Sequence, residues 1–122
     1  MASFTSNTKM HRLSLFVVLL LATTYTASSF SCLGSLMSLI SCQSYVTSQN
    51  NFPPPRSCCN AVTRLNARLT TTLLRQEACV CFKDYTSRMT NINDEKISSL
   101  PQACGLVLGF QIGTDINCTA IP

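Results

Sequence analysis

The chain has 122 residues, of which 46% are hydrophobic, with nine Lys and Arg against five Asp and Glu. A net charge of +4, without basic residues interleaved with aromatic ones, excludes the strongly basic surface of a nucleic-acid-binding protein. Eight cysteines in so short a chain favour one small domain held by disulfides.

The first part of the chain has the pattern of a secretory signal peptide. Basic residues at positions 9–12 precede a short apolar run at 13–22. About ten apolar residues are too few to cross a bilayer. Small residues then follow and place the predicted cleavage near Ser29, which divides the chain into a signal peptide (1–29) and a secreted domain (30–122).

The secreted domain keeps every cysteine, and an even number predicts four disulfides. The only histidine, His11, belongs to the predicted signal, and a Cys-x-Cys pair does not fit zinc-finger spacing, so neither metal nor cofactor is expected. Loss of Lys9 and Arg12 leaves seven basic residues against five acidic ones, a net charge of +2. The cysteines are Cys32, Cys42, Cys58, Cys59, Cys79, Cys81, Cys104 and Cys118.

Apolar periodicity and capping residues predict an all-α domain of four helices, followed by an irregular tail (104–122) held by two cysteines. The apolar face of the first helix is predicted to carry Leu33, Leu36, Met37, Ile40 and Val46. The first predicted helix spans 32–49 and is ended by three prolines, and the second runs from Cys58 to about Leu69 with Ser57 as its cap. The third is capped by Thr71 or Thr72, runs to about Met89 and carries an Asp84–Arg88 pair. The fourth is short: Asn93 caps it, Asp94 and Glu95 lie in its first turn, and Pro101 ends it.

Two cysteine doublets act as branch points. On a helix, Cys79 and Cys81 point about 200° apart, and Cys58 and Cys59 about 100° apart, so each doublet joins one helix to two other elements. Four disulfides contribute about 8–16 kcal/mol, whereas an internal cavity of about 300 Å³ costs about 7 kcal/mol. Such a domain tolerates a cavity, although a solid core with the same cross-links satisfies the sequence equally well.

The cysteine order Cys-x9-Cys-x15-CysCys-x19-Cys-x-Cys-x22-Cys-x13-Cys resembles the eight-cysteine pattern of plant non-specific lipid-transfer proteins of the larger type (type 1), in the prolamin superfamily. The segments "CCNAV", "RLNA", "TTLLRQEACVCFK" and "SLPQACG" are also similar. The resemblance implies a four-helix fold around a hydrophobic tunnel. It also implies a secreted, extracellular monomer (apoplast or cell wall) that binds fatty acids, lysolipids or phospholipids, contacts membranes transiently and transfers lipids between membranes or to the extracellular matrix.

The resemblance also implies roles for individual residues. A Thr-x-x-Asp-Arg box near the tunnel mouth has Leu74 and Arg75 at its last two positions here, so Arg75 is expected at the headgroup while the aspartate is absent. A second box has Phe110 where the family has a tyrosine, so headgroups should be held loosely. The expected tunnel walls are Leu36, Ile40, Val62, Leu65, Leu69, Ile97, Leu106, Leu108, Phe110 and Ile112.

For the disulfides, Val80 is the point of conflict. An apolar residue between Cys79 and Cys81 goes with the swapped pairing of the smaller family type, whereas the spacings match the larger type. We give the spacings more weight. The implied pairs are Cys32–Cys81, Cys42–Cys58, Cys59–Cys104 and Cys79–Cys118.

An enzyme and an inhibitor or defence peptide are the two alternative classes of function. An enzyme is disfavoured because the secreted domain has no histidine, and the consecutive Asp94 and Glu95 cannot face each other as an acid–base pair. An inhibitor of digestive hydrolases (amylase or protease) or a defence peptide uses a similar scaffold and would present segment 50–57 as an exposed loop, although its prolines are better explained as a helix connection. The sequon at 117–119 is expected to stay unglycosylated, and no GPI signal is expected after Cys118.

Overall fold

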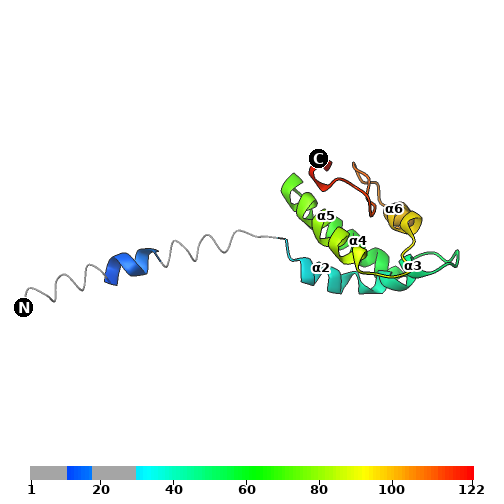
Figure 1. The fold of residues 1–122 in the computed structure, drawn as a ribbon, viewed down its shortest axis with the longest axis horizontal. Helices are drawn as coiled ribbons and strands as arrows, with labels where there is room; N and C mark the ends of the chain where they lie inside the picture. Colours follow the sequence, from blue (N-terminus) through cyan, green and yellow to red (C-terminus); the bar gives the residue numbers. More distant parts are fainter. Residues whose placement is uncertain (1–10, 18–29) are drawn as a thin grey trace, which may run out of the picture.

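The computed structural model describes residues 11–17 and 30–122 (Figure 1). Residues 11–17 form a short helix, and the predicted cleavage position near Ser29 lies outside the described residues. The described part of the chain is helical and has no strand, which confirms the all-α prediction. None of its helices has the length and apolar character needed to cross a bilayer. The elements of the domain are α2 (Cys32–Ser38), the 3-10 helix η1 (Ile40–Cys42), α3 (Gln43–Thr47), α4 (Arg56–Arg68), α5 (Thr72–Ser87), α6 (Asp94–Ala103) and the 3-10 helix η2 (Cys118–Ala120).

The first predicted helix, 32–49, is broken into α2, η1 and α3. Near the break, the Ser38 hydroxyl donates to the Ser35 carbonyl at 2.8 Å, and a side-chain bond of this kind bends helices. The Cys42 N–H then bonds to the Leu39 carbonyl at 2.9 Å, which is the tighter 3-10 pattern. The predicted continuous helix was therefore wrong: the chain turns through η1, and the apolar periodicity does not register this tighter turn.

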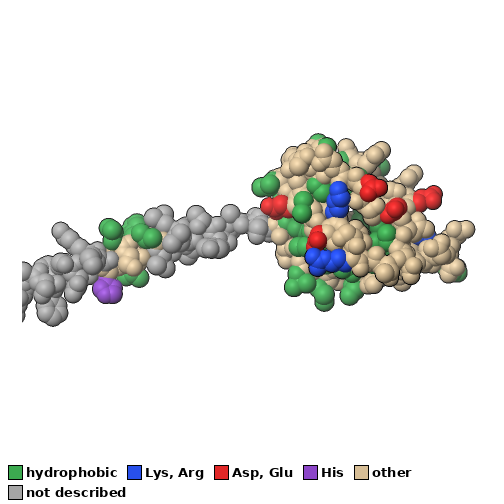
Figure 2. Space-filling view, in the orientation of Figure 1, with side chains coloured by type: hydrophobic (Ala, Val, Ile, Leu, Met, Phe, Trp, Pro, Cys, Tyr) green, Lys and Arg blue, Asp and Glu red, His purple; other side chains and the backbone are tan. Residues whose placement is uncertain are grey.

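The apolar face predicted for that helix is only partly buried. Val46 is buried, but Leu33, Met37 and Ile40 are 73%, 62% and 58% exposed. Figure 2 shows hydrophobic side chains projecting at the edge of the molecule where Figure 1 draws α2. The face of α2 that carries Leu33 and Met37 therefore remains open to solvent.

Helix α4 begins at Arg56, two residues before the predicted start, and no side chain caps it. Ser57 lies inside the helix, so its predicted capping role was wrong. Pro55 occupies the N-cap position with φ −59°, and its carbonyl accepts from the Cys59 N–H at 3.1 Å. Because the proline ring fixes φ close to helical values, it leads directly into the first turn.

Helix α5 has the N-cap that the sequence predicted. The Thr71 hydroxyl accepts from the Leu74 N–H at 3.2 Å. The Asp84–Arg88 pair is also present, with Nη2 of Arg88 at 3.1 Å from Oδ2 of Asp84. The threonine run therefore marks a genuine helix start.

Helix α6 starts as predicted and ends later than predicted. The Asn93 side chain accepts from the Lys96 N–H at 3.2 Å. Pro101 lies inside the helix rather than at its end. The helix stops where Gly105 adopts φ 76°, its N–H bonded to the Gln102 carbonyl and the next N–H bonded to the Pro101 carbonyl. This is a Schellman motif, so glycine rather than proline ends the helix.

Disulfides rather than a large apolar core join these elements. The structure forms four pairs, the same as those implied by the resemblance, and leaves no free cysteine. Apart from Pro101, eight apolar side chains are buried among the described residues, and three of them are half-cystines: Cys42, Cys58 and Cys81. The core cluster of Cys42, Val46, Cys58 and Leu100 lies between η1, α3, α4 and α6. The packed core is therefore small, and part of it also faces the cavity described below.

Candidate functional site

An apolar cavity of about 210 Å³ lies between the helices and the tail. Its wall comes from α2, η1, α3, α4, α5, α6 and the tail, and it is somewhat smaller than the roughly 300 Å³ considered for the sequence. Of the predicted wall residues, the structure places Leu36, Ile40, Val62, Leu65, Leu69, Ile97, Leu108, Phe110 and Ile112 around this cavity.

Leu106, which was expected in the wall, does not line the cavity. It directly follows Gly105, and its N–H is held by the Pro101 carbonyl at 2.8 Å. This bond fixes Leu106 in the turn that ends α6, so the wall on this side begins two residues later with Leu108.

The longest helix supplies wall residues that the sequence argument did not name. Ala78, Phe82, Tyr85 and Met89 line the cavity from α5 and the residues just after it. Their spacing of three or four residues is the signal of one helix face and could have identified them. The cysteine pattern of this segment is more conspicuous than its apolar periodicity.

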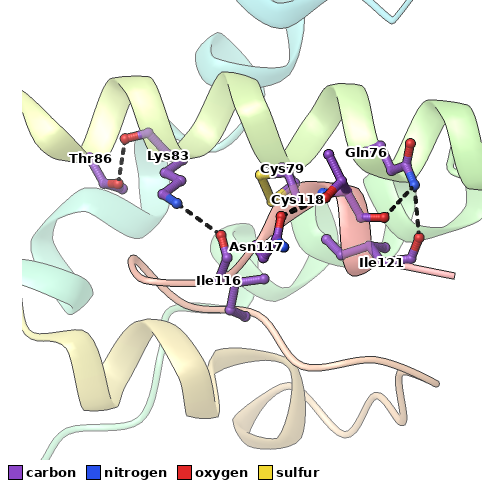
Figure 3. The surroundings of a disulfide bond; sticks show 9 residues. Gln76, Cys79, Lys83, Thr86, Ile116, Asn117, Cys118 and Ile121 are labelled. Carbon is purple, nitrogen blue, oxygen red and sulfur yellow. Dashed lines mark hydrogen bonds between the residues drawn. A yellow bond between two sulfur atoms is a disulfide. The ribbon is translucent and has the colours of Figure 1, made fainter.

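The opposite wall is the tail, which α5 holds through a set of side chains that we name the tail clasp: Gln76, Cys79 and Lys83 (Figure 3). The Gln76 amide donates to the carbonyls of Thr119 and Ile121 at 3.2 and 3.1 Å. The Lys83 ammonium donates to the Ile116 carbonyl at 2.9 Å, and Cys79 is bonded to Cys118. Ile116 and Ile121 both line the cavity, so the tail clasp positions part of its wall.

Arg75, the residue expected at a lipid headgroup, lines the cavity but already has partners in the protein. Its Nε donates to the main-chain oxygen of Pro122 at 2.6 Å, and Nη1 donates to the Leu69 carbonyl at 3.0 Å. Nη2 lies 3.4 Å from the Thr72 hydroxyl. The arginine therefore fastens the tail to the turn between α4 and α5.

Some of the lining residues are also exposed, and such residues mark where the cavity reaches the surface. Ile40, Lys83 and Tyr85 are exposed lining residues of this kind, from η1 and α5. Leu74, which replaces the aspartate of the first box, does not line the cavity, whereas Phe110 of the second box does. The rim therefore has an apolar side at Ile40 and a cation at Lys83.

The chain is similar to proteins of known structure and family. The family model described as "Protease inhibitor/seed storage/LTP family" matches residues 32–118. The non-specific lipid-transfer protein of Daucus carota is 34% identical over 104 residues, which cover 84% of this chain and 87% of the relative. Non-specific lipid-transfer protein 3 of Pisum sativum is 33% identical over 94 residues, which cover 77% and 79%.

The chain belongs to the non-specific lipid-transfer protein family.

Solved lipid-transfer proteins share this fold. The wheat protein complexed with two molecules of phospholipid aligns with a TM-score of 0.67 and 29% identity, covering 74% of this chain and 98% of that one. The barley protein in complex with a lysophosphatidylcholine aligns with a TM-score of 0.69 and 27% identity, covering 76% and 100%. Among the described residues of this lipid-transfer protein, no group of three His, Cys, Asp or Glu side chains is arranged to hold a metal ion.

Proposed function

We propose that the protein binds one long acyl chain in its cavity and transfers lipids between membranes or to the extracellular matrix. The observation that carries this proposal is the apolar cavity of about 210 Å³, which is built from η1, from helices α2 to α6 and from the tail. Relatives from wheat and barley hold phospholipid or lysophospholipid in the same fold. We assign the protein to binding and transport rather than catalysis, because its only histidine lies in the predicted signal peptide.

Apolar burial supplies the affinity in this proposal. Each methylene moved from water into the cavity contributes about 0.8 kcal/mol, so affinity rises with chain length until the cavity is full. The cavity is smaller than the roughly 300–1,000 Å³ of typical small-molecule pockets, so a long chain has to displace part of the wall. The tail is the wall segment with the least regular structure, and we assign the displacement to it.

Headgroups are held loosely in this proposal. A guanidinium has five N–H donors, and three donors of Arg75 already serve the tail, the turn before α5 and Thr72. Phe110 lines the cavity with a ring that has no hydroxyl. The Lys83 ammonium at the rim already donates to the Ile116 carbonyl, which leaves the Tyr85 hydroxyl as a neutral polar group there. One hydrogen bond to a charged group contributes about 1.5–3 kcal/mol, so its absence relaxes headgroup preference by tenfold or more.

Transient membrane contact is assigned to the exposed face of α2. Leu33 and Met37 lie one helical turn apart on that face, and Ile40 follows directly after the helix. Ile40 also lines the cavity, so the exposed apolar surface continues into the proposed lipid site. A lipid could pass from a bilayer to the cavity along this apolar route without crossing water.

We further propose that the protein acts outside the cell as a monomer. Its signal-like N-terminal segment and its four disulfides suit an oxidising compartment. The predicted boundary between residues 29 and 30 remains part of this proposal.

Displacement of a fluorescent fatty acid tests the binding proposal. We expect saturated acids to displace the probe more strongly as the chain lengthens, with fatty alcohols and lysophospholipids of equal length acting similarly. Leu65→Arg should abolish uptake because it places an unpaired charge in the cavity wall. Leu73→Arg, at an exposed position of α5 outside the wall, is the matched control. Equal probe binding by the two variants would contradict the proposal.

The alternative function is inhibition of an amylase or protease through the loop at 50–57. The Lys96 ammonium donates to the Asn50 carbonyl and lies 4.9 Å from the centre of the Tyr45 ring, so one end of this loop is anchored. Phe52 in the same loop is exposed. Inhibition of either enzyme, together with no displacement by any lipid, would favour this alternative.

A further inference from the structure

Phe30, at the junction between the N-terminal segment and α2, contacts α5 through its main chain and through its ring. The main-chain N–H of Phe30 donates to Oε2 of Glu77 at 3.2 Å in a partly buried position. The Phe30 ring meets the Phe82 ring edge-on, with centroids 6.0 Å apart and planes at 88°. Cys32, two residues on, is bonded to Cys81. Phe30 is thus fixed against α5 by its main chain, its side chain and a nearby cross-link.

Glu77 lacks a cationic partner among the described residues, where the Asp84–Arg88 pair is the one salt bridge. Its side chain has one hydrogen-bond partner there, the Phe30 N–H. Moving a carboxylate partly out of water costs free energy unless charge or hydrogen bonds compensate it. The position therefore favours a cation at the place of the Phe30 nitrogen.

Resting on the boundary already proposed between Ser29 and Phe30, we propose that the new α-ammonium that processing leaves on Phe30 forms an ion pair with Glu77. Hydrolysis by one water breaks the peptide bond, leaves a carboxylate on Ser29 of the departing peptide and gives the Phe30 nitrogen a protonated amine. An amide with one N–H becomes an ammonium with three. The processing step therefore builds the electrostatic contact that fastens the N-terminus of the secreted protein to α5.

The geometry restricts the site of the cut. A cut further upstream places the amine at least one residue away from Glu77, and consecutive Cα atoms are about 3.8 Å apart. A cut after Phe30 removes the ring that packs against Phe82 and turns Ser31, whose hydroxyl accepts from the Gly34 N–H at 3.2 Å, into the terminal residue. The bond between Ser29 and Phe30 is the one whose cleavage keeps these contacts and gives Glu77 a cation.

The contact also gains strength on cleavage. Before cleavage a neutral amide donates to the carboxylate, and after cleavage an ammonium adds the attraction between opposite charges at hydrogen-bond distance. Two other acidic residues provide a contrast: Asp84 is already paired with Arg88, and Asp115 is exposed. Glu77 is therefore the acidic residue whose partner appears when the precursor is processed.

The test uses the full precursor expressed in a secreting host. We expect the intact mass of the secreted protein to correspond to a chain that begins at Phe30. A second precursor carries Gly-Ser inserted between Ser29 and Phe30, which moves the new amine away from Glu77. Each form is made with Glu77, with Glu77→Gln and with Asp115→Asn, and each product is unfolded in urea at pH 6.5, where a free α-amine is protonated.

We expect Glu77→Gln to lower the folding equilibrium constant about tenfold in the form that begins at Phe30, and about threefold or less in the extended form. Asp115→Asn should have the same small effect in both forms. A mature chain that starts elsewhere would overturn the cleavage site. An equal effect of Glu77→Gln in both forms would overturn the ion pair. Neither outcome depends on lipid binding, so the proposed function is tested separately.

Discussion

Helix α2 and the tail are both joined to α5 by one disulfide, yet α5 holds them in different ways. Apart from the Cys32–Cys81 bond, the N-terminal segment receives one side-chain hydrogen bond from α5, through Glu77. The tail receives the Cys79–Cys118 bond and side-chain hydrogen bonds from three residues, Arg75, Gln76 and Lys83. The irregular segment therefore needs more side-chain support than the helical one.

The two attachments also differ in which side donates the hydrogen bonds. The main-chain N–H of Phe30 lies just before the N-cap of α2, and α5 offers it an acceptor, the Glu77 carboxylate. An irregular tail leaves main-chain carbonyls without partners, and α5 offers donors to it. A basic residue beside an apolar cavity, such as Arg75, can thus serve to hold the protein's own main chain by hydrogen bonds rather than to bind a ligand.

Removal of either disulfide should cause the largest loss of stability, and the two variants should differ in how much fatty-acid affinity they lose. The pairs close segments with sequence separations of 49 and 39 residues, so Cys32→Ala with Cys81→Ala, and Cys79→Ala with Cys118→Ala, should each lower stability by about 4 kcal/mol. The second variant should lose more affinity for a fatty acid, because the tail supplies several wall residues whereas α2 supplies Leu36 alone. Urea unfolding and probe titration measure both effects. Equal affinities in the two variants would show that the tail does not shape the site.

Gln76→Met should have the next largest effect, a loss of about 1–3 kcal/mol, because two tail carbonyls lose their donor. The matched control is Gln102→Met, since the Gln102 side chain is exposed on α6. Chemical denaturation compares the two variants. A loss of the same size in both would mean that the tail clasp contributes nothing beyond its disulfide.

Thr71→Ala should lower stability by about 1 kcal/mol, because the hydroxyl caps the helix that carries both attachments. Ser57→Ala provides the contrast, since α4 begins at Arg56 and uses no side-chain cap. Its effect on the thermal midpoint should be close to zero. If Ser57→Ala proved as harmful as Thr71→Ala, the start of α4 would have to be reassigned.

The smallest effect is expected from Arg88→Ala, at the end of α5. The two partners of this ion pair are 76% and 63% exposed, so solvent screens the attraction and the loss should be no more than about 0.5 kcal/mol. Added salt should reduce even this difference. A larger loss that persists in high salt would indicate that the end of α5 supports the wall through Arg88.

Helix existence and two helix starts could be predicted because their causes are local. Thr71 and Asn93 cap helices with their own side chains, three residues before the N–H groups that they accept from. The break after α2 and the early start of α4 could not be predicted from periodicity. They involve the 3-10 turn of η1 and the fixed φ of Pro55, which an apolar pattern does not register.

Most of the apolar wall could be predicted, since wall residues recur at helical spacing. The role of Arg75 could not. Its guanidinium bonds to the main-chain oxygen of Pro122, which lies 47 residues away in the sequence. A main-chain oxygen is offered by any residue type, so no sequence pattern marks it as an acceptor. The long-range partners of Gln76 and Lys83 escaped notice for the same reason.

The small core has a consequence for how such a protein can diverge. Apart from Pro101, three of the eight buried apolar residues among those described are half-cystines, so much of the fold is specified by cross-links rather than by side-chain fit. Val46 and Leu100 belong to both the core and the cavity wall, whereas wall residues such as Leu65 are only half-buried. Substitutions at the half-buried wall residues remove less packing that the fold requires, so ligand preference can change there while the fold is kept.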